Sequence, residues 1–179
     1  TCVYAKENGT RAAYLGVCGE GVEAQLIEDT LNTKGIEHDR CRYIPGEGGF
    51  ALVTLRDGDR VFLGSNKGGV ARTHLLELTQ EDLAYAQGFS LVYSNCNGFA
   101  DRELPKLKAA GIPIAFDFSD RWTPDYLQAT LPWVDIALLS CSHLPAGQRE
   151  EVLAQALHLG ARIAVATAGQ EGSWVLWEG

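Results

Sequence analysis

Short hydrophobic runs alternate with amphipathic stretches along the second half of the chain. The runs, each of strand length, cover 90–95, 113–118, 134–140 and 161–169. The stretches between them have apolar residues near helical spacing and cover 102–111, 124–131 and 147–160. Strands that alternate with helices of this length indicate βαβ units. We therefore predict an α/β fold whose mainly parallel sheet is flanked by helices.

The first half follows the same rhythm with one interruption. A short strand is expected over 11–19, and helices are expected over 22–35 and 73–87. Between these helices, the segment GFALVTLRDGDRVFLG consists of two alternating β segments around Asp57-Gly58, which is a strong hairpin signal. We predict that about residues 48–70 form a small antiparallel β lid within a single domain spanning 1–179.

Composition narrows the classes of protein. The chain has 179 residues, of which 46% are hydrophobic and 21% charged, and 23 acidic residues against 15 basic ones give a net charge of −8. This is a globular composition without a basic nucleic-acid footprint, and we expect neither a nucleic-acid nor a membrane partner. The five cysteines are widely spaced without a CxxC pair, which favours reduced thiols and a cytoplasmic location.

The two ends of the chain read as interrupted elements. The segment TCVYAKENG resembles the second half of a helix that stops at Gly9, and GSWVLWEG resembles one side of a hairpin. The sequence also contains no methionine. We expect the chain to be part of a longer protein.

Polar residues follow the predicted strands, where ligands of open α/β sheets bind. This rule selects Ser94, Asn95, Asn97, Asp117, Ser119, Asp120, Ser140, Ser142, His143, Thr167 and Gly169. Each also has a structural alternative, because strand-to-helix loops are polar and Ser, Thr, Asp and Asn cap helices.

The stretch AFDFSDRW contains several residues for which both a ligand-binding role and a structural role are open. Asp117 lies near the end of a buried strand, where the cost of burying a carboxylate implies either a hydrogen-bonding or charged partner or a functional role. Asp120 is expected to cap the next helix or to pair with Arg121. Trp122 either stacks on a ligand or covers the core. We predict a functional role for Asp117 and a structural one for Asp120.

A second candidate site lies in VATAGQEGSWVLW. Thr167 ends a strand, and Gly169 and Gly172 shape the following turn, where a hydroxyl and exposed amides are able to bind phosphate oxygens. Neither a GxxxxGK[ST] nor a GxGxxG motif is present, which argues against a P-loop and against a Rossmann dinucleotide site. The histidines and cysteines form no recognisable metal-binding set.

These features together resemble the ribokinase (PfkB) family of carbohydrate kinases, and especially its fructosamine/fructoselysine 6-kinase branch. The segment GFALVTLRDGDRVFLGSNKGGVA is similar to the family's β lid, and AFDFSDRW is similar to a stretch of the fructoselysine kinases. The segment GARIAVATAGQEGSWVLWEG is similar to the family's nucleotide-site strand and turn. Their order and spacing carry the resemblance.

The resemblance implies a ribokinase-like fold and ATP- and Mg²⁺-dependent phosphorylation of a small-molecule sugar or fructosamine. It assigns Thr167 and Gly169 to the nucleotide and Gly172 to the shape of the turn. It places Asp117 near the sugar or the metal–phosphate end. Gly48, Gly49 and Phe50 match the start of the lid over the sugar, and lid pairing in this family implies a homodimer.

The sequence departs from the family pattern in several places. The position expected for the magnesium-associated Asn-x-x-Glu motif reads Ser140 to His143, as the deviating fructoselysine branch allows, so no metal ligand is assigned. The N-terminal sugar motif and the C-terminal Gly-Ala-Gly-Asp, with its catalytic base, are absent, and the base is expected beyond residue 179.

Two alternatives remain at this point. One is a non-catalytic relative that binds sugar or nucleotide, which the altered Asn-x-x-Glu position permits. The other is an aspartyl phosphatase, prompted by a strand that ends in acids. Such an enzyme requires Asp-x-Asp, whereas Asp117 and Asp120 are one residue further apart.

Overall fold

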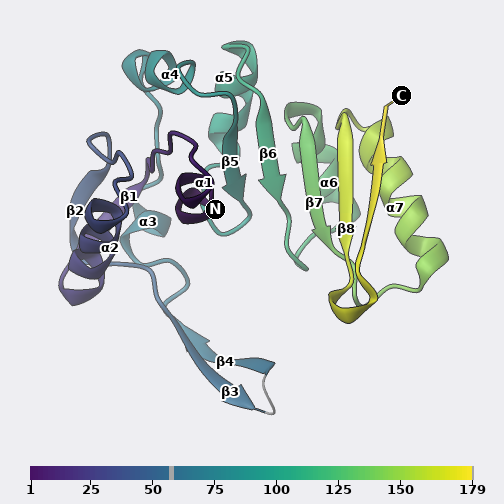
Figure 1. Cartoon of the computed structure of the whole chain (residues 1–179), viewed down its shortest axis with the longest axis horizontal. Coiled ribbons are helices and arrows are strands. Elements are labelled where there is room, and N and C mark those ends of the chain that lie inside the picture. The colour runs from purple at the N-terminus through teal and green to yellow at the C-terminus, as the bar shows by residue number, and fades with distance from the viewer. Residues whose placement is uncertain (57–58, 179) are drawn as a thin grey trace. The chain divides into compact units, whose positions relative to one another are not determined.

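The computed structural model describes residues 1–56 and 59–178 (Figure 1). The chain forms an α/β structure with mainly parallel strands, and a small antiparallel pair is present as well, which confirms the predicted fold class. The chain divides into two compact units, Thr1–Leu76 and Glu77–Gly179.

The first unit contains a parallel strand pair, an antiparallel strand pair and short helices. Hydrogen bonds pair β1 with β2 in parallel and β3 with β4 in antiparallel. Gly69 illustrates the tight packing at the base of β3 and β4, because a Cβ atom added there would clash with the Glu47 carbonyl oxygen. The elements are α1 (Cys2–Glu7), β1 (Val17–Glu20), α2 (Val22–Thr33), β2 (Arg42–Glu47), β3 (Ala51–Arg56), β4 (Asp59–Ser65) and α3 (Val70–Thr73).

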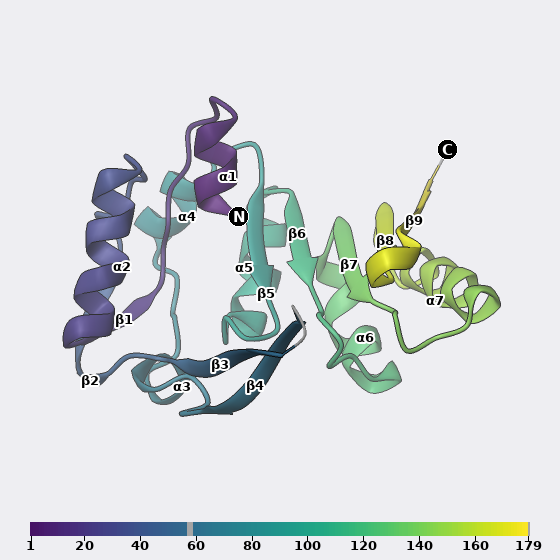
Figure 2. The same cartoon turned by 60° about the horizontal axis from the view of Figure 1, so that its bottom comes forward.

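The predicted hairpin segments are observed as β3 and β4. Their register pairs Ala51 with Ser65 and Val53 with Phe62, and an irregularity follows Leu52. The ribbon of this pair extends away from α2 and from the β1–β2 pair of the same unit (Figures 1 and 2). The predicted turn residues Asp57 and Gly58 lie outside the described residues.

The prediction of a helix over 73–87 is wrong about the residue at which the helix begins. Residues 74–79 are not helical, and the observed helix α4 covers Gln80–Ala86. Thr79 explains the difference, because its hydroxyl accepts a hydrogen bond from the Asp82 amide and the Asp82 carboxylate accepts one from the Thr79 amide. This reciprocal capping box fixes where a helix begins.

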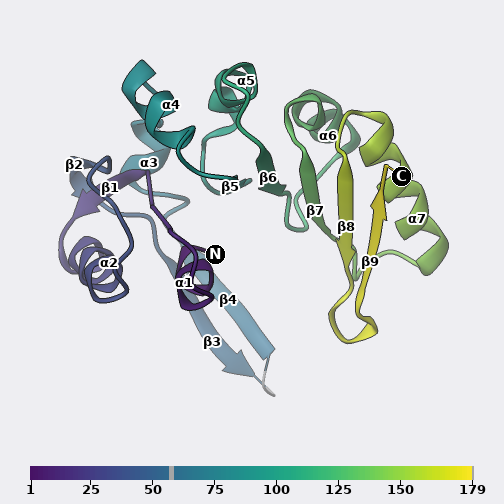
Figure 3. The same cartoon turned by 45° about the horizontal axis from the view of Figure 1, so that its top comes forward.

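The second unit is built on a sheet with the order β5-β6-β7-β8-β9. Neighbours from β5 to β8 are parallel, whereas β9 runs antiparallel to β8, as the predicted C-terminal hairpin requires (Figure 3). The strands are β5 (Val92–Asn95), β6 (Ile114–Asp117), β7 (Ile136–Ser140), β8 (Ile163–Thr167) and β9 (Ser173–Trp177). The helical segments after α4 are η1 (Asp101–Glu103), α5 (Leu104–Ala109), α6 (Pro124–Thr130), η2 (Leu131–Trp133), α7 (Ala146–His158) and η3 (Gly169–Glu171).

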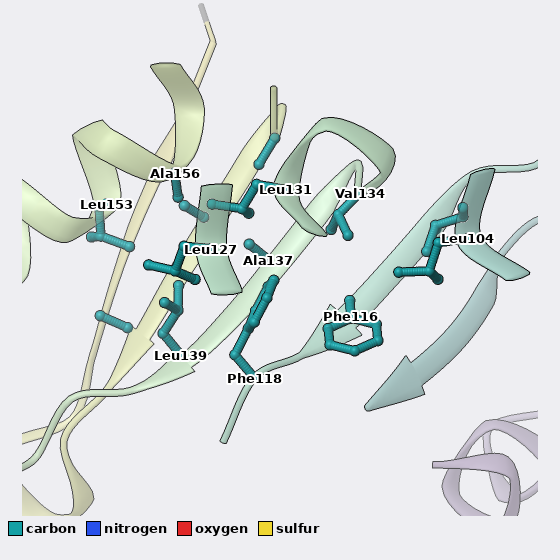
Figure 4. Packing of buried hydrophobic residues seen from close by; sticks show 14 of the residues in the cluster. Leu104, Phe116, Phe118, Leu127, Leu131, Val134, Ala137, Leu139, Leu153 and Ala156 are labelled. Atoms are coloured by element: carbon teal, nitrogen blue, oxygen red, sulfur yellow. The ribbon is translucent and has the colours of Figure 1, made fainter. Parts of the chain in front are cut away.

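One face of this sheet carries the hydrophobic core. The strand order runs in one direction, so right-handed crossovers place α5, α6 and α7 on the same face. Figure 4 shows Leu104, Leu127 and Leu153 from these helices directed toward the strands. They enclose Phe116 and Phe118, whose rings pack edge to face with centroids 4.9 Å apart. This packing fixes β6 and β7 and the polar residues at their ends.

Candidate functional site

The carboxyl ends of the parallel strands meet at one edge of the second unit's sheet. The register pairs Asn95 with Asp117 and Ser140 with Thr167. The candidate residues that end β5, β6, β7 and β8 therefore lie along one rim, as the sequence predicts.

Asp117 is half-buried, and both of its carboxylate oxygens are engaged. Oδ1 accepts a hydrogen bond from the Ser119 amide at 2.8 Å, and Oδ2 accepts one from the Tyr93 hydroxyl at 3.1 Å. Ser119 has a φ of 54°, a left-handed conformation that is uncommon outside glycine. Asp117 thus stabilises the turn that leaves β6, and its proposed contact with substrate stays a prediction.

Asp120 does not cap the next helix. The N-cap of α6 is Thr123, whose hydroxyl accepts a hydrogen bond from the Tyr126 amide at 3.2 Å. Arg121 donates to the Asn97 side-chain oxygen at 3.1 Å, which joins the exits of β5 and β6. Thr123 is better placed as a cap because it directly precedes Pro124 at the first helical position.

Trp122 links the exits of β6 and β7. Its indole Nε1 donates to the Ser140 carbonyl oxygen at 3.3 Å, and its ring lies 5.6 Å from that of His143. The Ser119 carbonyl oxygen accepts the Ser140 amide at 2.8 Å. These contacts give the segment AFDFSDRW a structural role in shaping the rim.

Thr167, Gly169 and Gly172 lie together on the turn between β8 and β9. The Thr167 side chain is exposed at the end of β8, and its hydroxyl is 3.5 Å from the Leu139 carbonyl oxygen. Gly169 and Gly172 have φ values of 56° and 94°, and a Cβ atom added at either would meet nothing within 4 Å. The turn is therefore open to a ligand that approaches the backbone closely.

A buried arginine that the sequence interpretation missed adjoins this turn. Arg149 lies on α7 and donates through Nη1 to Glu171 Oε2 at 2.7 Å. This hydrogen bond is the main cause that raises the pKa of Arg149 and lowers the pKa of Glu171. A signal was present, because Arg149 shares the i, i+4, i+7 face of α7 with the buried residues Leu153 and Ala156.

The lid-start residues Gly48, Gly49 and Phe50 lie between β2 and β3 in the first unit. Asn66, which the sequence interpretation also missed, ties this segment to the end of β4. Its side-chain oxygen accepts the Phe50 amide at 3.0 Å and the Gly68 amide at 3.3 Å. Its side-chain nitrogen donates to the Gly48 carbonyl oxygen at 2.7 Å and to Glu47 Oε2 at 3.0 Å.

All five cysteines belong to the described residues and are free thiols. Cys18 and Cys41 form a close pair in the first unit. A hydrogen bond with the Cys41 side chain is the main cause that lowers the pKa of Cys18 to about 7, against the opposing effect of burial. The same bond raises the pKa of Cys41.

Within residues 1–56 and 59–178, no group of three or more His, Cys, Asp or Glu side chains is arranged to hold a metal ion. Among these residues there is also no helix with the length and apolar character needed to cross a membrane.

Comparison with known proteins identifies the family. Residues 1–178 match the pfkB family carbohydrate kinase model. The chain is 32% identical over 172 residues to "Fructosamine kinase FrlD" from Bacillus subtilis (strain 168), covering 96% of this chain and 60% of that protein. It is 29% identical over 181 residues to "Fructoselysine 6-kinase" from Escherichia coli (strain K12), covering 99% and 66%. The chain thus spans about two thirds or less of these curated relatives.

Solved structures share the fold of this chain. Arabidopsis thaliana ribokinase complexed with ribose and ATP superposes with a TM-score of 0.79 at 18% identity, covering 99% of this chain and 61% of that one. The microbiome-derived acarbose kinase Mak1 gives a TM-score of 0.74 at 22% identity, covering 99% and 58%. The aspartyl-phosphatase alternative finds no support in these matches. The predicted resemblance is confirmed, and the chain belongs to the pfkB family of carbohydrate kinases.

Proposed function

We propose that this protein is an ATP-dependent kinase that phosphorylates a hydroxyl group of a sugar or sugar-amine of the fructosamine class. The observation that carries the proposal is the open turn of Thr167, Gly169 and Gly172 at the carboxyl edge of the sheet. The printed names of the two curated relatives support the substrate class.

Phosphoryl transfer depends mainly on positioning and on electrostatic stabilisation. In the proposal, the Thr167 hydroxyl and the backbone of Gly169 bind the nucleotide phosphates or ribose, and Gly172 shapes the turn. Asp117 faces the sugar or the phosphate end of the rim. The segment Gly48, Gly49 and Phe50 starts the lid over the sugar. No residue of this chain is assigned the role of the catalytic base.

The family implies Mg²⁺ as well as ATP. Magnesium prefers oxygen ligands in octahedral geometry and is commonly held by one or two carboxylates together with substrate phosphates. Asp117 is an acid at the rim, and each of its oxygens accepts one hydrogen bond. Because no group of three or more His, Cys, Asp or Glu side chains in residues 1–56 and 59–178 is arranged to hold a metal ion, we assign the ion to none of them.

Two further parts of the proposal concern location and assembly. The free thiols favour a cytoplasmic protein. The exposed apolar side chains of β3 and β4 favour a homodimer that pairs through the lid, because large exposed apolar patches mark interaction surfaces. The main residues of this surface are Leu52, Val53, Leu55, Phe62 and Leu63.

The activity is tested by ATP consumption of the full-length protein across a panel of ketoses and fructosamines. We expect phosphorylation of at least one member of the panel. Turnover on none of these substrates, with ADP still bound in calorimetry, would contradict the kinase activity and favour the non-catalytic alternative.

Thr167→Val tests the nucleotide assignment. We expect the KM for ATP to rise by about tenfold, because one hydrogen bond to a charged group is worth about 1.5 kcal/mol. Thr33→Val, at an exposed position on α2, is the matched control and should leave the KM for ATP and the KM for the sugar unchanged. An unaltered KM for ATP in Thr167→Val would remove Thr167 from the nucleotide site.

A further inference from the structure

Arg149 is an unusual member of the buried face of α7. Only 2% of its surface is exposed, although it projects from a helix whose buried neighbours are Leu153 and Ala156. A charged side chain is rarely buried unless it is paired and hydrogen-bonded, because its transfer from water is costly. The contacts of Arg149 therefore indicate what the residue does.

The guanidinium group joins three segments that are separate in sequence. Nε donates to the Cys141 carbonyl oxygen at 3.2 Å, directly after β7. Nη1 donates to Glu171 Oε2 at 2.7 Å, within η3. The guanidinium carbon also lies 4.7 Å from the centroid of the Trp174 ring, at the start of β9. One cation thus holds the exit of β7, the turn after β8 and the start of β9.

A second connection brings the candidate residue Thr167 into the same assembly. The Cys141 amide donates to the Thr167 carbonyl oxygen at 2.7 Å, while the Cys141 carbonyl oxygen accepts Arg149. Cys141 is therefore held between Arg149 and the end of β8. The position of the Thr167 backbone depends on a residue that Arg149 fixes.

Backbone hydrogen bonds close the turn, including one from the Ala168 amide to the Gly172 carbonyl oxygen at 2.9 Å, but few side chains anchor it. It contains two glycines at positive φ, with nothing packed against the Cβ positions of either, and glycine has the largest conformational freedom of any residue. Glu171 lies between them, and 64% of its side chain is exposed. The ion pair with Arg149 ties this exposed residue to the core of the unit. A turn that is ordered before binding loses less entropy when a ligand arrives.

We propose that Arg149 is a positioning residue for the nucleotide turn: through Glu171, Trp174 and Cys141 it holds residues 167–172 in their binding conformation without contacting the nucleotide. This inference rests on the proposed binding of nucleotide by Thr167 and Gly169. In this arrangement α7, the helix that precedes β8, keeps the turn ordered for ligand binding.

The test compares Glu171→Ala and Arg149→Lys with the wild type in the full-length protein. ADP affinity is measured by calorimetry, KM values by steady-state kinetics and the order of the turn by amide hydrogen exchange. Glu171→Ala is the principal variant because Glu171 is largely exposed, and urea unfolding checks that the fold tolerates Arg149 without its carboxylate partner. Arg149→Lys keeps the charge but lacks the planar fork that reaches two acceptors. Glu150→Ala, an exposed glutamate of α7, is the matched control.

We expect Glu171→Ala to weaken ADP binding and to raise the KM for ATP by about fivefold, as the ordering of one or two side chains implies. The KM for the sugar should change by less than about twofold, the usual size of a remote surface effect. Amide exchange over 168–173 should accelerate. Arg149→Lys should show the same pattern to a smaller degree, and Glu150→Ala should match the wild type.

The outcomes separate this inference from the proposed function. Faster exchange in the turn with unchanged ADP affinity would make Arg149 a merely structural residue and overturn the inference. A wild type that binds ADP but transfers no phosphate would defeat the kinase proposal, while the effect of Glu171→Ala on ADP affinity would still decide the role of Arg149. A wild type that binds no ADP would overturn both.

Discussion

Asp117 ends a buried strand, and its contacts explain how the chain accommodates an acid there. Its carboxylate accepts the Ser119 amide and the Tyr93 hydroxyl, so the charge is hydrogen-bonded on both oxygens. The left-handed Ser119 that follows depends on this support. A residue of this kind shapes the rim whether or not it also contacts a substrate. Arg149 likewise shapes the turn between β8 and β9 through its hydrogen bonds.

The Arg149–Glu171 pair predicts a pH dependence of stability. Its hydrogen bond lowers the pKa of Glu171 from the ordinary value of 4.5, so the ionised carboxylate favours the folded state. The stabilisation is complete above about pH 4.5, the unfolded-state value, and is lost as the pH falls through the lower folded-state pKa. Glu171 is largely exposed, so solvent screening keeps the effect small.

Urea unfolding of the wild type and Glu171→Gln measures this effect. We expect the wild type to be more stable between pH 6 and 8, and the difference to shrink below about pH 4.5 as Glu171 is protonated. Glu150→Gln provides the control, because the exposed Glu150 lies outside the pair. A difference that stays the same down to about pH 3 would show that the ion pair is not its source.

At the scale of elements, the periodicity of the sequence predicts the parallel strands of the second unit, their helices and the lid strands, but it does not predict β2 of the first unit. It locates Thr167, Gly169 and Gly172 on one turn because a strand end and two glycines are local signals. It misplaces the start of α4, although the Thr79–Asp82 capping box is also local. Arg149 and Asn66 were missed for another reason. The hydrogen-bond partners of Arg149 lie 8 and 22 residues away, and those of Asn66 lie up to 19 residues away. No local pattern specifies which of these atoms a side chain meets.

Asn66 gives the prediction for the lid. Its side chain bonds to the amides of Phe50 and Gly68 and to the carbonyl oxygen of Gly48, so it closes the base of β3 and β4. In Asn66→Ala we expect amide exchange at Phe50 and Gly68 to accelerate by about tenfold or more, since each lost hydrogen bond is worth about 1 kcal/mol.

Hydrogen-exchange measurements on the full-length protein check this prediction. Asn32→Ala is the control, because Asn32 is an exposed residue of α2 where alanine favours the helix. Unchanged protection of Phe50 in Asn66→Ala would mean that β3 and β4 are held together by their own ladder. If the lid closes over the sugar, the same variant should also raise the KM for the sugar more than that for ATP.

At the scale of the molecule, the proposed parts of the site belong to different units of the chain. Gly48, Gly49 and Phe50 lie in Thr1–Leu76, whereas Asp117 and the turn at Thr167 lie in Glu77–Gly179. The family match spans both units, and the curated relatives are longer than this chain. Sugar binding, nucleotide binding and assembly are therefore properties to measure on the full-length protein.

The lid surface makes a prediction about assembly. Val53 and Phe62 are directly paired across β3 and β4, and Leu55 follows on the same face of the ribbon. The exposed fractions of Leu55 and Phe62 are 72% and 69%. A second copy that covers such a face would remove apolar area from water, at about 25 cal/mol per Å². We expect the full-length protein to be a homodimer that pairs through this face.

Light scattering of Phe62→Arg tests that expectation. A guanidinium in the centre of the face would have to be buried unpaired. The variant should therefore be monomeric, or its dimer should dissociate at a much higher protein concentration than the wild-type dimer does. Leu26→Arg is the matched control, since Leu26 on α2 is 66% exposed and should tolerate the same change without loss of the dimer. A monomeric wild type would refute the dimer. Dissociation by Leu26→Arg but not by Phe62→Arg would place the interface on α2 rather than on the lid.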